Sequence, residues 1–466
     1  MTPPNAESGD IQGLLRSGYG RLKEACFLLL SVTDATAART WLSTAQVTTV
    51  EHLRRHVTTA LHVALTASGM RALGVAENVV AGFSAEFVSG MAGEEGRSRR
   101  LGDVGASAPS LWRWGGPREP HALLMLYAET DIAAWRQQIE ATGLGAGFAV
   151  LDTLRTTDMG GKEPFGFTDG VSQPRMDWIG ERQPGTTADV EYGNLLTAGE
   201  FLLGYPNEYG LYTDRPLLDS DQPGAQTLPM AEDDPTRRDL GRNGSYLVLR
   251  ELAQEVRGFW HFIAAHAGDE ASRVALASAM VGRQMSGDAL VPISGRPIRG
   301  VGPDAVDIAR NQFTYDDDSN GSRCPFGAHV RRANPRTGDM PGGRQGLVAR
   351  LIRMLGFGKQ DLSEDLVATS RFHRIIRCGR EYGRQLDPEA ALQPDAADPQ
   401  SGLHFICLNA NIARQFEFIQ NAWLMSAKFD GMSGEALRAQ PRVEEALPPE
   451  AVALRLALPV ATACSS

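Results

Sequence analysis

Four segments of the chain repeat one pattern of apolar and polar positions. Each begins with a short apolar run, passes through a polar break, and continues with apolar side chains at helical spacing, which predicts a strand followed by a helix. Thr33-Asp34 and Thr130-Asp131 stand in the first two breaks, where helix N-caps are expected. The apolar runs cover residues 26–32, 122–128, 245–250 and 403–408, and the expected helices cover 35–42, 132–139, 256–263 and 412–423.

These four units fall into two well-separated pairs. A ferredoxin-like βαββαβ domain contains two strand–helix units, so the pattern predicts two such domains in tandem, an α+β protein with antiparallel sheets. Residues 216–240 are rich in Pro, Asp and Gly, as a connecting segment should be. We therefore expect an N-terminal domain at 1–215, a linker at 216–240, a C-terminal domain at 241–440 and a tail at 441–466.

The composition is that of a globular protein: of 466 residues, 42% are hydrophobic and 22% charged. The net charge of −10 argues against nucleic acid or an anionic membrane as a partner. The first ten residues lack the basic and apolar regions of a signal peptide, and no apolar run approaches the ~20 residues of a membrane span, so a cytoplasmic protein is expected. Five cysteines at wide spacing form no zinc or haem-attachment motif, so we expect reduced thiols.

Residues 163–174 place a carboxylate in unusual surroundings. Asp169 stands beside Gly170, which can take a positive φ, and close in sequence to Phe165 and Phe167. Such neighbours can aim a carboxylate and partly desolvate it, as acid–base chemistry requires. The alternative is a simple turn closed by an Asx-type hydrogen bond.

Among the nine histidines, only His329 has distinctive neighbours, including the small Gly-Ala pair at 327–328. A lone histidine is more often a hydrogen-bonded structural residue than a metal ligand, although its neutral imidazole is able to bind a metal. His373 is the main rival. His52 and His56 are spaced i, i+4 but have no third ligand nearby, so a solvated surface is the better interpretation for them.

Three stretches of the chain resemble motifs of the dye-decolorizing peroxidases, a family of haem enzymes. Gly166-Phe167-Thr168-Asp169-Gly170 resembles the GxxDG signature, and residues 323–336 resemble the stretch that carries the proximal haem ligand. Residues 373–383 resemble the strand and turn whose arginine points over the distal haem face, although Cys378 and Arg380-Glu381 depart from the usual turn. Other matches are scattered over most of residues 10–425.

The resemblance implies a duplicated ferredoxin-like fold that holds non-covalent haem b. It implies an enzyme that reduces hydrogen peroxide and oxidises aromatic or dye-like donors, with mild acid favouring dye oxidation. His329 would bind the iron on one face; on the other, Asp169 would carry a proton and Arg377 would stabilise negative charge. Three arginines are expected to meet the haem propionates: Arg331, Arg332 and Arg336. Phe167 and Gly170 are also expected to contact the haem.

Strand alternation puts Arg374 and Arg377, which are three residues apart, on opposite sides of the strand. Alternation does not say which of the two faces the haem. We expect Arg377 to point in and Arg374 to point out.

Two other classes of function stay open. A haem-handling protein with incidental peroxidase activity would need the iron ligand but would have no use for Asp169. An oligomeric scaffold with the same fold would bind no haem at all. The sequence indicates neither the physiological electron donor nor the oligomeric state.

Some smaller assignments are also open. Glu417 is a candidate hydrogen-bond acceptor for the second nitrogen of His329, with a backbone carbonyl as the alternative. Residues 338–366 form an insertion whose stretch 347–357 reads as a basic amphipathic helix, either a lid, a contact for a membrane or partner, or a plain surface insertion. Three aromatic residues are candidates for relaying electrons from a surface-bound donor to the haem: Tyr382, Trp260 and Trp423. The alternative interpretation is that all three pack in the core.

Overall fold

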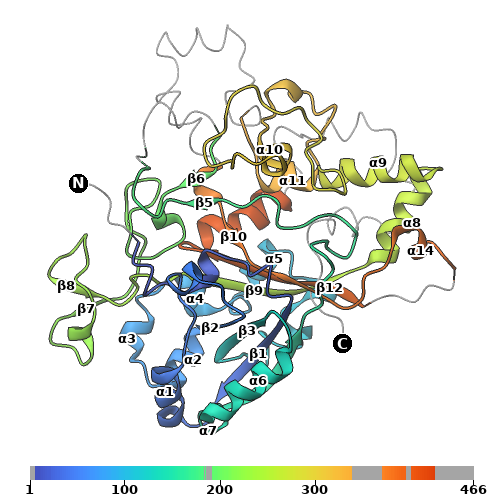
Figure 1. The fold of residues 1–466 in the computed structure, drawn as a ribbon. Coiled ribbons are helices and arrows are strands. Elements are labelled where there is room, and N and C mark those ends of the chain that lie inside the picture. The colour runs from blue at the N-terminus through green and yellow to red at the C-terminus, as the bar shows by residue number, and fades with distance from the viewer. Residues whose placement is uncertain (1–5, 183, 185–191, 338–369, 395–399, 426–466) are drawn as a thin grey trace, which may run out of the picture.

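The computed structural model describes residues 6–182, 184, 192–337, 370–394 and 400–425. Two antiparallel sheets lie at its centre, with helices and long loops around them (Figure 1). The insertion at 338–366, its expected helix, the tail at 441–466 and Cys464 lie outside the described residues.

The first sheet has the strand order β2-β3-β1-β4, which is the order of a ferredoxin-like βαββαβ domain. Its helices α1 and α6 follow β1 and β3, as expected. Asp34 begins α1 and accepts hydrogen bonds from the backbone N–H groups of Thr36 and Ala37 at 2.9 Å. The elements are β1 (Glu24–Val32), α1 (Ala35–Thr44), β2 (Thr59–Leu65), β3 (Ala122–Ala128), α6 (Ile132–Ile139) and β4 (Phe148–Arg155).

The second sheet is built around β12, which pairs with β9 along its whole length on one side and with the short strands β10 and β11 on the other. A helix follows β9 and a helical segment follows β12, so all four expected strand–helix units are present. The described residues contain no counterpart of β4 in this sheet. The elements are β9 (Tyr246–Gln254), α8 (Val256–His266), β10 (Ile376–Arg377), β11 (Arg380–Tyr382), β12 (Ser401–Asn409) and the helical segment at Ala413–Glu417 and Ile419–Leu424.

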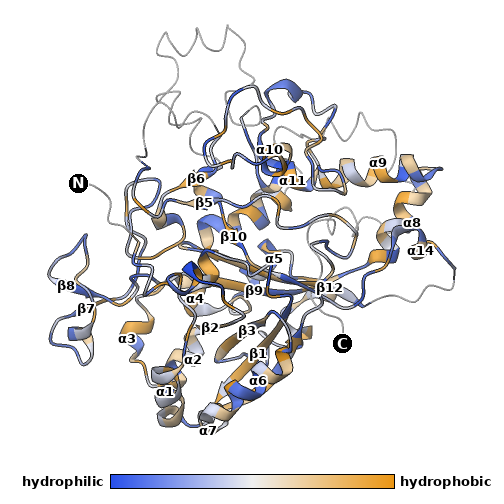
Figure 2. Cartoon of the chain, viewed as in Figure 1, coloured by the Kyte–Doolittle hydropathy of each residue, from blue (hydrophilic) through white to orange (hydrophobic). Residues whose placement is uncertain are grey.

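The two sheets pack face to face through one apolar core, to which β1 contributes Phe27 and Leu29 and β12 contributes Ile406 and Leu408. Because side chains alternate along a strand, Leu28 of β1 faces the other way, where it packs with Trp41 of α1. By the same alternation, β9 and β12 present a second face away from the first sheet. Figure 2 shows hydrophobic colouring along the strands of both sheets and hydrophilic colouring on many outer loops.

The remaining helices surround the sheets. They are α2 (Ala67–Ala72), α3 (Glu77–Val80), α4 (Ala85–Ser89), α5 (Glu95–Arg100), α7 (Gly145–Gly147), α9 (Glu270–Val281), α10 (Ala305–Asn311), α11 (His329–Ala333) and α14 (Pro388–Ala391). None of the helices in the described part of the chain has the length and apolar character needed to span a membrane.

Two small two-stranded sheets complete the fold: parallel β5 (Arg175–Met176) with β6 (Leu195–Leu196), and antiparallel β7 (Leu217–Asp219) with β8 (Arg237–Asp239). The β7–β8 pair falls within the predicted linker and stands out at the left of Figure 1. The domain boundaries placed around this segment stay a prediction.

The four described cysteines, Cys26, Cys324, Cys378 and Cys407, are buried and free, in agreement with the expectation of reduced thiols. His52 and His56 have exposed side chains, and no cluster of metal-binding side chains occurs among the residues that the structure describes. Two of the suggested electron relays, Trp260 and Trp423, are 1% and 7% exposed and belong to apolar clusters. Tyr382 is half-buried and stacks on His404.

Candidate active site

The loop that carries Asp169 is closed tightly on itself. Glu163 N–H donates to the Phe167 carbonyl and Gly166 N–H donates to the Glu163 carbonyl, both at 2.8 Å, and Gly166 takes a φ of +101° that glycine tolerates best. Asp169 N–H donates to the Gly161 carbonyl at 3.0 Å, and Gly170 has a φ of +70°. The backbone therefore fixes the position of the Asp169 carboxylate.

Arg377 comes from β10 and meets this carboxylate: its Nη1 lies 3.3 Å from Asp169 Oδ1. Its Nη2 donates to the Ser172 carbonyl at 3.2 Å. The amide of Gln173 clamps the backbone of Arg377 by accepting from its N–H at 3.1 Å and donating to its carbonyl at 2.7 Å. The loop at 163–174 and β10 thus hold each other, although about 200 residues separate them.

His329 is the first residue of α11, and its side chain is half-buried. Burial lowers the pKa of His329 to about 4; the charge of Arg377 acts in the same direction, and Asp169 opposes it. The imidazole is therefore neutral at physiological pH, which is the form that binds a metal. Its Nδ1 is buried without a hydrogen-bond partner among the described residues.

The expectation that Glu417 accepts from His329 is wrong in this structure. Glu417 instead forms a buried ion pair with Arg97 of α5. The alternative acceptor, a backbone carbonyl, is not found either within the described part of the chain.

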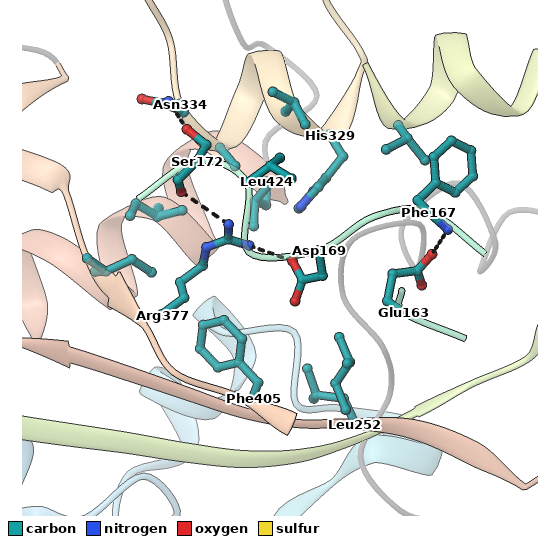
Figure 3. Close-up of a pocket in the computed structure, with 18 of the residues that line it drawn as sticks. Glu163, Phe167, Asp169, Ser172, Leu252, His329, Asn334, Arg377, Phe405 and Leu424 are labelled. Carbon is teal, nitrogen blue, oxygen red and sulfur yellow. Dashed lines mark hydrogen bonds and ion pairs between the residues drawn. The ribbon is translucent and has the colours of Figure 1, made fainter. Parts of the chain in front are cut away.

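Asp169, Arg377 and His329 all line one cavity of about 270 Å³, which lies on the outward face of the second sheet. In Figure 3 the imidazole points into the cavity from α11, opposite the linked Asp169 and Arg377, with Leu252 and Phe405 on the strands below. Phe167 also lines the cavity, whereas Gly170 does not. The other apolar side chains on its wall are Phe165, Val171, Pro174, Val281, Val330, Ala333, Ile375, Leu403, Phe416, Ile419 and Leu424.

His373, the rival ligand, lies on the same wall. Burial lowers the pKa of His373 to about 4, its Nδ1 contacts the Arg414 carbonyl, and its ring stacks on Phe418 at 3.7 Å. The charges of Asp169 and Arg377 act on His329, whereas the charge that acts on His373 is that of Arg414. The geometry favours His329 as the imidazole that faces the ion pair.

Two expectations about arginines are corrected by the structure. Arg374 does not point away into solvent: it is 5% exposed, lines the cavity, and donates to Tyr192 Oη at 3.0 Å and Asn194 Oδ1 at 2.6 Å. Strand alternation fails here because β10 contains only Ile376 and Arg377, so Arg374 precedes the strand.

The three arginines expected at propionates do not line the cavity. Arg331 is fully buried, where it pairs with Asp318 at 2.9 Å and lies over the Tyr315 ring at 4.1 Å. Arg336 is 1% exposed and donates to the carbonyls of Asn311 and Phe313, and Arg332 donates to the Trp423 carbonyl at 2.7 Å. All three hold the loops around α11 together.

Among the polar residues on the wall that the sequence does not reveal are Gln254 of β9, Arg283, and Glu163 as a half-buried acid rather than a flanking residue. Arg283 is 3% exposed and donates to the carbonyls of Gly287 and Arg310. The alternation of β9 could have pointed to Gln254, because the same face presents Leu252. No sequence signal separates Arg283 from other arginines.

The residues present fit a haem group. A neutral imidazole with an unpartnered second nitrogen faces a charged pair across a cavity that is apolar on much of its wall. Haem iron takes an imidazole on one face, and its reactivity is set by the polar groups on the other.

Comparison with known proteins agrees with this interpretation. No model of a known protein family matches the sequence. The chain is 29% identical over 447 residues to the dye-decolorizing peroxidase msp1 of Mycetinis scorodonius, covering 90% of this chain and 74% of that protein. It is 29% identical over 432 residues to a multifunctional dye peroxidase of Amycolatopsis sp., covering 86% and 78%.

Comparison with solved structures also finds dye-decolorizing peroxidases. The crystal structure of a DyP-type peroxidase from Auricularia auricula-judae matches with a TM-score of 0.66 at 24% identity, covering 93% of this chain and 87% of that one. Over most of its length the chain resembles the dye-decolorizing peroxidases. Members of this family are haem enzymes, and this dye-decolorizing-type peroxidase has the duplicated ferredoxin-like α+β fold expected from its sequence.

Proposed function

We propose that this peroxidase binds non-covalent haem b through His329, reduces hydrogen peroxide, and oxidises aromatic or dye-like donors. One observation carries the proposal: a single cavity brings a neutral, half-buried imidazole from the second half of the chain opposite the ion pair of Asp169 and Arg377. Haem, when bound, supplies the redox-active iron.

Asp169 is the group that would move a proton. Its carboxylate is 39% exposed and faces the cavity, within reach of a small molecule, and its backbone is fixed by the closed loop. It would take a proton from one oxygen of hydrogen peroxide and give it to the other, which leaves as water. A positioned acid–base group contributes about 10²–10⁴-fold to such a step.

Arg377 would stabilise the negative charge that develops on the leaving oxygen. Its guanidinium is held on two sides, by Asp169 and by the Ser172 carbonyl, so it needs no reorganisation when the charge appears. The clamp from Gln173 serves the same end at the backbone.

For the propionates, the cationic groups on the cavity wall replace the arginines expected from the sequence. Arg250 is already paired with Asp103. Among the described residues, Arg374 and Arg283 donate to neutral groups, namely hydroxyl, amide and carbonyl oxygens, so the charge of each guanidinium can meet a propionate. Arg374 and Arg283 are therefore the residues we assign to these carboxylates.

The haem-handling alternative does not account for the ion pair. A carrier needs only the iron ligand and an apolar cavity, whereas Asp169 and Arg377 point into the cavity and are kept there by the backbone. The deciding experiment is bleaching of an anthraquinone dye by haem-loaded protein between about pH 4 and 7. We expect bleaching that requires both protein and peroxide and that is faster in mild acid; bleaching no faster than that by free haem would contradict the proposal.

A further inference from the structure

Glu163 is the hub of the loop that carries Asp169. Its side chain is half-buried and lines the cavity. Its carboxylate accepts from Phe165 N–H at 3.0 Å and from Phe167 N–H at 2.9 Å, both on the same loop. With the two backbone hydrogen bonds already described, four hydrogen bonds join Glu163 to residues 165–167.

A third donor reaches the same carboxylate from the second half of the chain. Gln254 Nε2, at the end of β9, donates to Glu163 Oε2 at 2.8 Å. The other amide atom, Gln254 Oε1, is buried and has no hydrogen-bond partner among the described residues. If Glu163 is protonated, its O–H can donate to this oxygen after the amide turns over, so the link between loop and sheet can form in either state.

The surroundings of Glu163 favour a titration near neutral pH. Burial raises the pKa of Glu163 to about 7, against the hydrogen bonds from Phe165, Phe167 and Gln254, and the charge of Asp169 raises it further. Asp169 is on the same loop; β9 contributes the neutral Gln254, and α8 contributes Phe259, whose ring lies 4.6 Å from that of Phe165.

The chain between Glu163 and Asp169 is short and anchored at each step. Phe167 N–H is held by Glu163, Thr168 N–H donates to the Met285 carbonyl at 3.1 Å, and Asp169 follows directly. A change in the hydrogen bonds of Glu163 is therefore transmitted to Asp169 through two residues of fixed backbone.

We propose that Glu163 is a positioning residue of the peroxidase site, whose carboxylate, tied to Gln254, sets where Asp169 stands relative to Arg377 and the cavity. The inference rests on the proposed function. Glu163 does not itself touch the reacting atoms. A displacement of about 1 Å at a catalytic group can cost about 100-fold in rate, so the effect of losing this hub is measurable.

The test compares haem-loaded variants by the rate of reaction with hydrogen peroxide, per bound haem, in a stopped-flow spectrometer. Glu163→Gln keeps the size of the side chain but places an NH₂ group where an N–H now donates, so the loop must rearrange. We expect its rate to fall by about tenfold to 100-fold.

Glu200→Gln is the matched control. Glu200 is fully buried, and burial raises the pKa of Glu200, like that of Glu163, to about 7, but this residue pairs with Arg414 and does not line the cavity. We expect this variant to lose stability while its rate per bound haem stays within about twofold of wild type.

A second measurement distinguishes a Glu163 carboxylate that positions Asp169 and titrates from a variant that only destabilises the whole fold. The pKa of Glu163 is raised on folding, so its stabilising contribution is complete below the unfolded pKa of about 4.5 and is lost as pH rises through about 7. The difference in unfolding free energy between wild type and Glu163→Gln, from urea titrations followed by circular dichroism, should fall across that window. The peroxide rate of wild type should show an inflection near pH 7 that Glu163→Gln lacks.

Gln254→Leu keeps the carboxylate and the hydrogen bonds within the loop and removes only the link to β9. If Glu163→Gln does not bind haem, Gln254→Leu provides the test. A reduced peroxide rate in Gln254→Leu supports the inference, and a wild-type rate overturns it. A wild-type rate in Glu163→Gln, or an equal loss in Glu200→Gln, would also overturn it. If wild type itself does not react with peroxide, the proposed function fails, which is a different result from a reactive wild type with an equally reactive Glu163→Gln.

Discussion

Asp169 and Arg377 form an ion pair that contributes more to chemistry than to stability. Their side chains are 39% and 33% exposed, and an ion pair open to solvent stabilises a fold by about 0–1 kcal/mol. The backbone hydrogen bonds of the loop and the clamp of Gln173 hold the two groups in place, so neither depends on the other for its position. Either can therefore be replaced without unfolding the protein.

Replacement of Asp169 tests its role at this scale. We expect Asp169→Asn to lower kcat/KM for hydrogen peroxide by about 10²–10⁴-fold with an unchanged urea midpoint, because the amide cannot accept and release the proton. Steady-state kinetics with a dye as donor provides the measurement. Asp158→Asn, which removes an exposed ion pair with Lys23, is the control and should keep wild-type kinetics; a loss of less than tenfold in Asp169→Asn would count against the assignment.

Single residues differ in how well the sequence predicts them. Asp34 and Asp131 are expected to be N-caps because a short polar side chain before an apolar period favours that position, and the structure confirms both. Arg331 and Arg336 were assigned to propionates but are buried beside aromatic rings. A guanidinium serves a ligand, a carbonyl or a ring equally well, and only the fold decides among them.

At the scale of elements, β12 shows why the site forms where it does. Its residues alternate between the core shared by the two sheets and the cavity, so Ile406 packs inward while Leu403 and Phe405 form part of the cavity wall. The apolar run at 403–408 predicts the strand, but a run that is apolar on both faces does not reveal which face carries the site. Strands β10 and β11 contain two and three residues, which is too short for a sequence pattern to predict. Gly379 lies between them, where a Cβ atom would lie 2.6 Å from the His404 carbonyl oxygen.

Helix α5 tests how the two halves are joined. Arg97 is 5% exposed, pairs with Glu417, and donates to the Gly90 carbonyl at 2.6 Å. We expect Arg97→Ala to lower the free energy of unfolding by about 3–5 kcal/mol, because Glu417 would keep a buried charge without its partner.

Arg99 is the control on the same helix. It pairs with Glu95, and both side chains are largely exposed, so Arg99→Ala should cost less than about 0.5 kcal/mol. Urea unfolding of both variants measures the difference, and equal effects would show that the buried pair does not join the halves.

Strand β2 allows a test of pH dependence. His62 is 0% exposed, hydrogen-bonds to Tyr19 Oη at 3.0 Å, and burial lowers the pKa of His62 to about 3. A depressed pKa means that the stability is complete above the unfolded value of 6.5 and is lost as pH falls. Relative to His62→Gln, wild type should lose about 1.4 kcal/mol of unfolding free energy per pH unit between about 6.5 and 3.

The control for this slope is His56→Gln at an exposed position, whose stability should follow that of wild type at each pH. Urea midpoints at four or five pH values are sufficient. A difference between wild type and His62→Gln that does not change with pH would contradict the buried neutral imidazole.

At the scale of the whole molecule, the site is a property of the arrangement of the two halves. Asp169 comes from the first half, and His329 and Arg377 come from separate segments of the second, yet all three line one cavity. The sequence supplies each group in its own motif, and the resemblance to a family supplies the expectation that they meet. Local patterns could not predict the meeting, because it depends on contacts such as that of Gln173 with Arg377.

The most direct test of the central claim is the absorption spectrum of haem-loaded protein, recorded before and after addition of hydrogen peroxide, for wild type, His329→Ala and Asp169→Asn. We predict a Soret band in wild type and Asp169→Asn that is lost or shifted in His329→Ala, and a rapid change with peroxide in wild type alone. A Soret band in His329→Ala identical to that of wild type, or a wild-type response to peroxide in Asp169→Asn, would contradict the account.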